Sequence, residues 1–281
     1  MIPEIALPPH YWLYQVAFGL QLQALVLFLT YAAAPRRGFS LAATVALSVA
    51  ALLQGSFLVL LSRANGSLPL ASGFGALCFW SFSLTVLILW AEWRYQLGLL
   101  GAFLVPLSVL MLLMGFRFAK VDALPALGLA ETWLVFHVAL AMISYACFTV
   151  AAGVAVAFLV QERQLKRKHL GPLVYQLPPL NELELLAAQF ALVGTLSLSA
   201  SLLVGFIWQH NLGLSSLHDP KVQFSLLVWM AYTGSSILRR QQALRGRRYA
   251  YLLLALFLAI FFGYYLLNIY FGGHGFLKTG A

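Results

Sequence analysis

The sequence contains six histidines. They are its residues best suited to bind a metal, because neutral imidazole is the commonest metal ligand in proteins. His137 lies inside a long apolar segment, where an unpartnered polar side chain is costly in lipid. His274 lies in Phe271-Gly-Gly-His-Gly-Phe276, where glycines free the backbone and two phenylalanines flank the imidazole. His137 is therefore either a metal ligand or a histidine whose ring only bonds a neighbouring helix.

Two imidazoles that reach one mouth of a helical bundle from different segments meet the requirement for bis-histidine haem ligation, with apolar and aromatic walls for the macrocycle. Their spacing in the sequence does not establish that they converge. The sequence has no H-E-x-x-H, P-loop or G-x-S-x-G segment, and no histidine pair at the helical spacing that suits zinc. We therefore expect a binding protein rather than an enzyme, and we assign no role to His10, His210 or His218.

The elements that must position these histidines are apolar. Hydrophobic residues make up 62% of the chain and charged residues 9%, whereas an ordinary soluble domain has about 25% charged residues. Runs long enough to span about 30 Å of hydrocarbon begin near Tyr11, Phe39, Ala71, Tyr95, Thr132, Leu183, Gln223 and Tyr249. We predict an all-α integral membrane protein, in which one polytopic domain over residues 1–281 forms a bundle of eight transmembrane helices.

The 17 basic residues fall unequally on the two sides of such a bundle. One side carries Arg36, Arg37, Arg94, Arg163, Lys166, Arg167, Lys168, Arg239, Arg240, Arg245, Arg247 and Arg248. The other side carries Arg63, Arg117, Lys120, Lys221 and Lys278. Cytoplasmic loops carry the excess of basic residues, so we predict that both termini, His137 and His274 lie outside. The net charge of +9 then reflects topology and anionic lipids rather than nucleic-acid binding.

Three stretches carry a resemblance to a known family. They are Thr132-Trp-Leu-Val-Phe-His137-Val138 with Ser144-Tyr145-Ala146, then Asp219-Pro220-Lys221 with the basic turn Arg245-Gly-Arg-Arg248, and finally Gly273-His274-Gly-Phe276. Together, over residues 130–276, they resemble the haem-handling cytochrome c assembly family, which includes CcsA- and CcmC-type proteins and their HemX- and YpjD-like relatives. The resemblance implies that His137 and His274 are the outer axial ligands of a haem b.

One segment departs from the family pattern. Family members that present haem to apocytochromes carry a tryptophan-rich loop before the aspartate-proline-lysine, whereas this chain has Asn211-Leu-Gly-Leu-Ser-Ser-Leu-His218. Aromatic faces would stack on the haem edge, so their loss argues against direct delivery of haem to a cytochrome. The chain is therefore most similar to the HemX- and YpjD-like members.

The resemblance implies a haem-binding protein of the bacterial cytoplasmic (inner) membrane that acts in cytochrome c assembly or haem handling. Its expected partners are haem, membrane lipids, and either other cytochrome c assembly proteins or a haem-biosynthesis enzyme, with no nucleic acid. Two alternatives stay open: a HemX-like regulator of haem biosynthesis that acts through its cytoplasmic loops, and a haem exporter. An ion-coupled carrier is less favoured, because charged residues inside the spans are almost absent.

Overall fold

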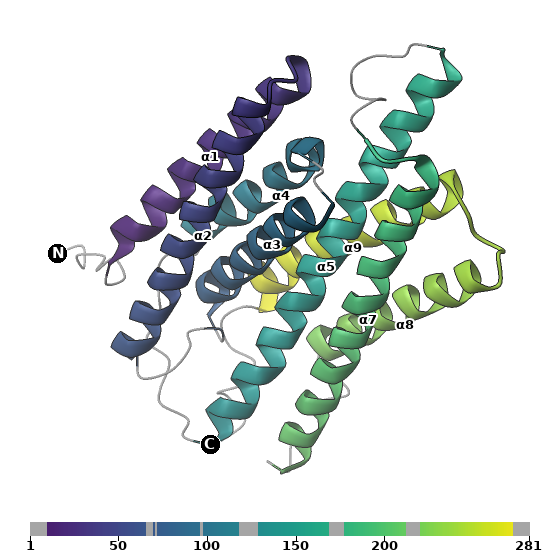
Figure 1. The fold of residues 1–281 in the computed structure, drawn as a ribbon. Coiled ribbons are helices and arrows are strands. Elements are labelled where there is room, and N and C mark those ends of the chain that lie inside the picture. The colour runs from purple at the N-terminus through teal and green to yellow at the C-terminus, as the bar shows by residue number, and fades with distance from the viewer. Residues whose placement is uncertain are drawn as a thin grey trace.

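The computed structural model describes residues 10–65, 70, 72–95, 98–117, 129–168, 177–211 and 220–271. The described residues form helices and short turns and contain no strand. The helices are α1 (Tyr11–Ala33), α2 (Arg37–Asn65), α3 (Gly73–Tyr95), α4 (Gly98–Arg117), α5 (Leu129–Lys166), α7 (Leu180–Asn211), α8 (Pro220–Arg240) and α9 (Arg247–Phe271). They run up and down beside one another (Figure 1), which confirms the prediction of an all-α protein.

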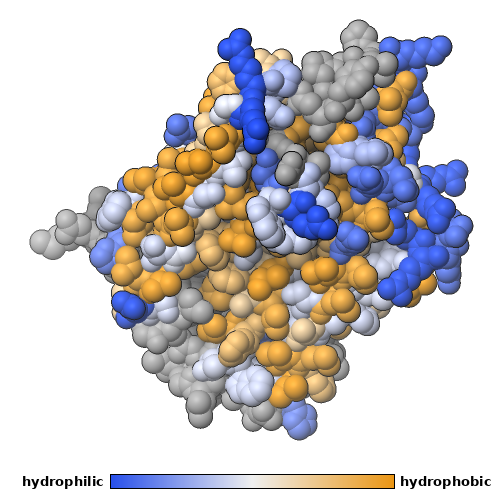
Figure 2. Space-filling view, viewed as in Figure 1, coloured by the Kyte–Doolittle hydropathy of each residue, from blue (hydrophilic) through white to orange (hydrophobic). Residues whose placement is uncertain are grey.

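Seven of the described helices are long and apolar enough to cross a membrane. They are helical because backbone groups in hydrocarbon must bond within their own segment. Large apolar side chains point outward where a soluble protein would carry charge, for example Leu52, Leu203 and Phe206. Figure 2 shows a wide hydrophobic surface over much of the visible face. The predicted span that begins near Gln223 is α8, and it falls short of the hydropathy of a membrane span because its second half contains Tyr232-Thr-Gly-Ser-Ser236.

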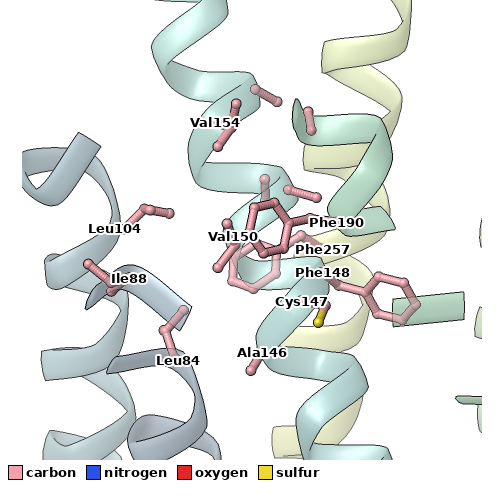
Figure 3. Packing of buried hydrophobic residues seen from close by; sticks show 14 of the residues in the cluster. Leu84, Ile88, Leu104, Ala146, Cys147, Phe148, Val150, Val154, Phe190 and Phe257 are labelled. Atoms are coloured by element: carbon pink, nitrogen blue, oxygen red, sulfur yellow. The ribbon is translucent and has the colours of Figure 1, made fainter. Parts of the chain in front are cut away.

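The centre of the bundle is α5, which packs against α3, α4, α7 and α9. Its middle consists of small and apolar residues that are almost fully buried, among them Ala146, Cys147, Val150 and Val154. Figure 3 shows these side chains facing residues of the neighbouring helices. Both cysteines of the described chain, Cys78 and Cys147, are buried and free, so they pack in the interior.

A buried polar network joins α1, α3 and α4 inside this apolar surrounding. The Gln21 amide nitrogen donates to the Thr85 hydroxyl at 2.8 Å, and its carbonyl accepts from the Ser108 hydroxyl at 3.1 Å. Ser81 in turn donates to the Ser108 carbonyl oxygen at 3.1 Å. These four side chains are fully buried, so the network sets how the first helix docks on the rest of the bundle.

The two ends of the bundle differ in charge. The twelve basic residues predicted to share one side lie in or beside the α1–α2 and α8–α9 turns, at the end of α3, and at and just after the end of α5. We call this end the basic end, and Figure 2 shows hydrophilic residues gathered over the ends of α5 and α8 and the start of α9. We call the opposite end, which carries the start of α5, the histidine end. Lys120 and Lys278 lie outside the described residues.

The longest helix is α5. It contains 38 residues, which corresponds to about 57 Å at 1.5 Å per residue. Its last turn lies at the basic end, where Lys166 pairs with Glu162 at 2.6 Å. A helix of this length is longer than a hydrocarbon layer of about 30 Å is thick.

Candidate functional site

His137 is held by α7 through two backbone contacts. Its Nδ1 lies 2.7 Å from the carbonyl oxygen of Ser201. In the reverse direction, the Ser201 hydroxyl donates to the carbonyl oxygen of His137 at 2.8 Å. The hydroxyl oxygen also lies 3.2 Å from Nδ1. The side chain is half-buried near the histidine end of α5, and its ring orientation is set by this pair of contacts.

The Ser201 carbonyl also fixes which ring nitrogen carries the proton. A carbonyl oxygen can only accept, so Nδ1 must donate, and the neutral imidazole then presents its lone pair at Nε2. Within the described part of the chain, Nε2 has no hydrogen-bond partner. Histidines that bind metals usually donate their other N–H to a carboxylate or a backbone carbonyl. The expected bond to a neighbouring helix is present, and it leaves the second nitrogen available to a ligand.

Gly205 provides the space for the imidazole. A Cβ at this position would lie 2.6 Å from Nδ1 and 2.7 Å from Cε1 of His137. Atoms that are not bonded do not approach so closely, so any larger residue at position 205 would displace the ring. The sequence contains a signal for this contact, because Ser197, Ser201 and Gly205 recur every four residues on α7. Small residues at that spacing are typical of close helix packing in membranes, and our sequence reasoning missed them.

The same face of α7 is bonded to α5 further into the bundle. Ser197 donates to the Leu140 carbonyl oxygen at 2.9 Å, and Ser144 donates to the Gly194 carbonyl oxygen at 2.8 Å. With the His137–Ser201 pair, these contacts form a ladder along the interface of two antiparallel helices. The ladder holds the imidazole on a rigid surface rather than on a mobile loop.

A tryptophan lies one helical turn from His137 on α5 and another lies one turn from Gly205 on α7. Trp133 precedes His137 by one turn of α5, and Trp208 follows Gly205 by one turn of α7, so each shares a face with its neighbour. Trp208 is buried, whereas Trp133 is 44% exposed. The donor set is thus one neutral imidazole nitrogen beside aromatic and apolar groups. This environment fits one axial position of a haem.

The described structure shows no second histidine bonded at the His137 site. His274 and His218 lie outside them, so the predicted pairing of His137 with His274 is not tested. His10 is exposed immediately before α1, and the ring of His210 lies 6.4 Å from that of Phe206. No three histidine, cysteine or acidic side chains cluster as a metal site among the described residues. A mononuclear site built from such a cluster therefore has no support there.

Comparison with known proteins agrees with the sequence resemblance. The chain matches the family described as Cytochrome C assembly protein over residues 70–274. "Protein HemX" from Brevibacillus brevis is 29% identical over 225 residues, which cover 79% of this chain and 82% of that protein. "Protein HemX" from Bacillus subtilis (strain 168) is 30% identical over 142 residues, covering 50% of this chain and 51% of that protein.

A second group of relatives carries a different name. "Cytochrome c biogenesis protein CcsA" from Synechococcus sp. (strain CC9902) is 25% identical over 228 residues, which cover 72% of this chain and 75% of that protein. The segment matched by the family, 70–274, contains both His137 and His274.

Proposed function

Because this chain belongs to the cytochrome c assembly protein family, we propose that it is a membrane protein that binds haem b in cytochrome c assembly or haem handling. His137 and His274 are its two axial ligands in this proposal. The observation that carries it is the 2.7 Å contact of His137 Nδ1 with the Ser201 carbonyl, because it directs the lone pair of Nε2 away from α7. The protein acts as a binder and has no catalytic role.

The residues of this chain have separate tasks in that function. His137 Nε2 would bind the iron, and the Ser201 carbonyl holds the Nδ1 proton so that the ring keeps one tautomer. Gly205 lets the ring lie close against α7. His274 supplies the second imidazole from the segment after α9. Haem b would supply an iron that binds imidazole nitrogens, and Trp133 on α5 and Trp208 on α7 would provide aromatic surface near it.

The orientation of the bundle is part of the proposal. α7 ends at the histidine end and α9 begins at the basic end, so the chain between them crosses the bundle as α8. Its 21 residues extend over about 31 Å, which suffices for a span although its composition is polar. The protein then has eight spans in the bacterial inner membrane, with both termini outside and the basic end on the cytoplasmic side, near anionic lipids.

An absorption spectrum of the detergent-purified protein tests the cofactor and its ligands together. We expect a Soret band, a pyridine haemochrome of the b type, and loss of the bis-histidine spectrum in His137→Ala and His274→Ala. His10→Ala is the matched control, because His10 is exposed at the start of α1. A purified protein without haem, or a spectrum that survives loss of both His137 and His274, contradicts the proposal.

A regulatory role is the second candidate function. Relatives named HemX are among the most similar proteins, and residues 212–218 contain no tryptophan. In that case the protein would act on a haem-biosynthesis enzyme through its basic loops. Deletion of the gene separates the two functions, since the regulator predicts changed porphyrin levels with intact c-type cytochromes. An assembly protein predicts loss of c-type cytochromes, and a haem exporter predicts haem flux in proteoliposomes.

A further inference from the structure

A polar stripe runs along one face of α8. Ser225, Trp229, Tyr232, Ser236 and Arg239 follow one another at intervals of four and three residues, which places them in line on a helix. The two members nearest the histidine end are bonded: Ser225 donates to the Lys221 carbonyl oxygen at 2.9 Å, and the Trp229 indole donates to the Ser199 hydroxyl at 2.8 Å. This half of the stripe is satisfied by protein.

In the half of the stripe nearest the basic end, protein groups do not satisfy the polar atoms. The Tyr232 hydroxyl, the Ser236 hydroxyl and Arg239 Nε are buried atoms without a hydrogen-bond partner among the described residues. The Tyr249 hydroxyl on α9 shares this condition, and the Arg239 guanidinium lies 5.5 Å from the centre of the Tyr249 ring. Tyr232 and Tyr249 are 0% and 1% exposed. The two tyrosine side chains are thus withdrawn from solvent, whereas the Arg239 side chain beside them is 25% exposed toward the basic end.

Protein groups nearby do not satisfy them. Glu184 Oε1 lies 3.6 Å from Arg239 Nε, which is too long for a hydrogen bond, and Glu184 Oε2 accepts from the Gly246 N–H at 2.9 Å. A serine can turn to a carbonyl of its own helix, but a phenol hydroxyl at the far end of its ring cannot. A polar group that is buried without a partner is destabilising. The Tyr232 and Tyr249 hydroxyls therefore require a partner that the described protein groups do not supply.

We propose that water enters the bundle from the basic end and binds along this half of α8 as far as Tyr232. Water fits better than an anion, because Glu184 already balances the charge of Arg239, and because the hydroxyls both donate and accept. The hydrated segment ends where the Tyr232 ring stacks on Phe148, with centroids 3.6 Å apart and planes at 16°. Val228, one turn further along α8, is buried and apolar.

The consequence is an aqueous site inside the bundle that is distinct from the His137 site. Protons and small hydrophilic molecules reach the middle of the protein from the basic end, whereas the half of α8 toward the histidine end stays dry. The low hydropathy that sets α8 apart from the other helices is then the composition expected of a helix that lines water. This inference does not depend on haem binding.

Accessibility of single cysteines in the full-length protein tests the proposal. Thr233 follows Tyr232 on α8, and its hydroxyl is also buried without a hydrogen-bond partner among the described residues. In a Cys78→Ala, Cys147→Ala background, Ser236→Cys and Thr233→Cys are treated with the anionic thiol reagent 2-sulfonatoethyl methanethiosulfonate in membrane vesicles of both orientations. We expect both cysteines to react from the side of the basic end only. Their rate should be at least about ten-fold above the controls, because only the thiolate reacts and a dry apolar environment suppresses it.

Two control variants test whether water is confined to the inner face of α8 and whether it stops at Tyr232. Ile237 lies beside Ser236 and is 49% exposed on the lipid-facing surface, so Ile237→Cys should be unreactive. Val228→Cys, beyond the Tyr232–Phe148 contact, should also be unreactive. Failure of both reporters to react, or equal reaction of Ile237→Cys, overturns the proposal. Equal reaction of Val228→Cys overturns the assigned limit at Tyr232.

Hydroxyl-radical footprinting of the unmodified protein provides a reading that needs no variant. Radicals formed in bound water should oxidise Tyr232 and Tyr249. Tyr14 is equally buried, but its hydroxyl donates to the Leu112 carbonyl oxygen, so it should stay unoxidised. Mass spectrometry that finds the three tyrosines equally protected contradicts the presence of water at this site.

Discussion

Alanine at position 205 should displace the His137 imidazole and weaken haem binding. The added methyl carbon would lie 2.6 Å from Nδ1, whereas contacts between unbonded atoms settle at about 3.5 Å, so the ring must retreat from α7 by about 0.9 Å. The present distance of 2.7 Å from Nδ1 to the Ser201 carbonyl oxygen would then become about 3.6 Å, which is no longer a hydrogen bond.

Loss of such a supporting contact typically lowers metal affinity by about 10- to 100-fold, which corresponds to about 1.4–2.8 kcal/mol of binding free energy. The assay is titration of the haem-free protein with haem, followed at the Soret band in detergent. We expect Gly205→Ala to bind with this loss of affinity and with a perturbed spectrum.

Gly19→Ala is the matched control for this prediction. A Cβ at Gly19 meets nothing within 4 Å, so the same change of glycine to alanine in α1 should leave affinity unchanged. Wild-type affinity and spectrum in Gly205→Ala would refute the reasoning, and so would an equal loss in Gly19→Ala, because then the effect would not come from the His137 contact.

Three further variants test other contacts. Ser201→Ala removes the hydroxyl bond to the His137 backbone but keeps the carbonyl that holds Nδ1; haem affinity should fall less than in Gly205→Ala, and thermal unfolding should show a loss of about 0.6–1.7 kcal/mol. Gln21→Leu removes the bonds from the amide to the Thr85 and Ser108 hydroxyls, which keep their bonds to carbonyls of their own helices, and should cost about 0.5–1.5 kcal/mol per lost bond in the same assay; an unchanged unfolding midpoint would show that the network does not hold α1. Glu184→Ala removes the carboxylate that faces Arg239 and accepts from the backbone of the α8–α9 turn; proteolysis between α8 and α9 should become faster, and equal cleavage rates would contradict the assigned contact.

The positions of the helices were open to prediction because each follows from a local property of the chain. Tyr11 and Thr132 mark where apolar runs begin, and α1 and α5 begin at or near them. Arg239 and Arg240 mark an end of the bundle because charge is excluded from hydrocarbon.

Three features depend on residues far apart in the sequence, and only the tertiary structure decided them. The tautomer of His137 is set by a carbonyl 64 residues away on α7, and its space by the missing side chain of Gly205. The polar residues of α8 divide into a bonded and an unbonded half according to which helices lie opposite them. Local hydropathy identified the seven described helices that are apolar enough to cross a membrane, because transfer from water depends on the segment alone. Pairing of polar atoms between helices depends on their register and distance of approach, which no single segment encodes.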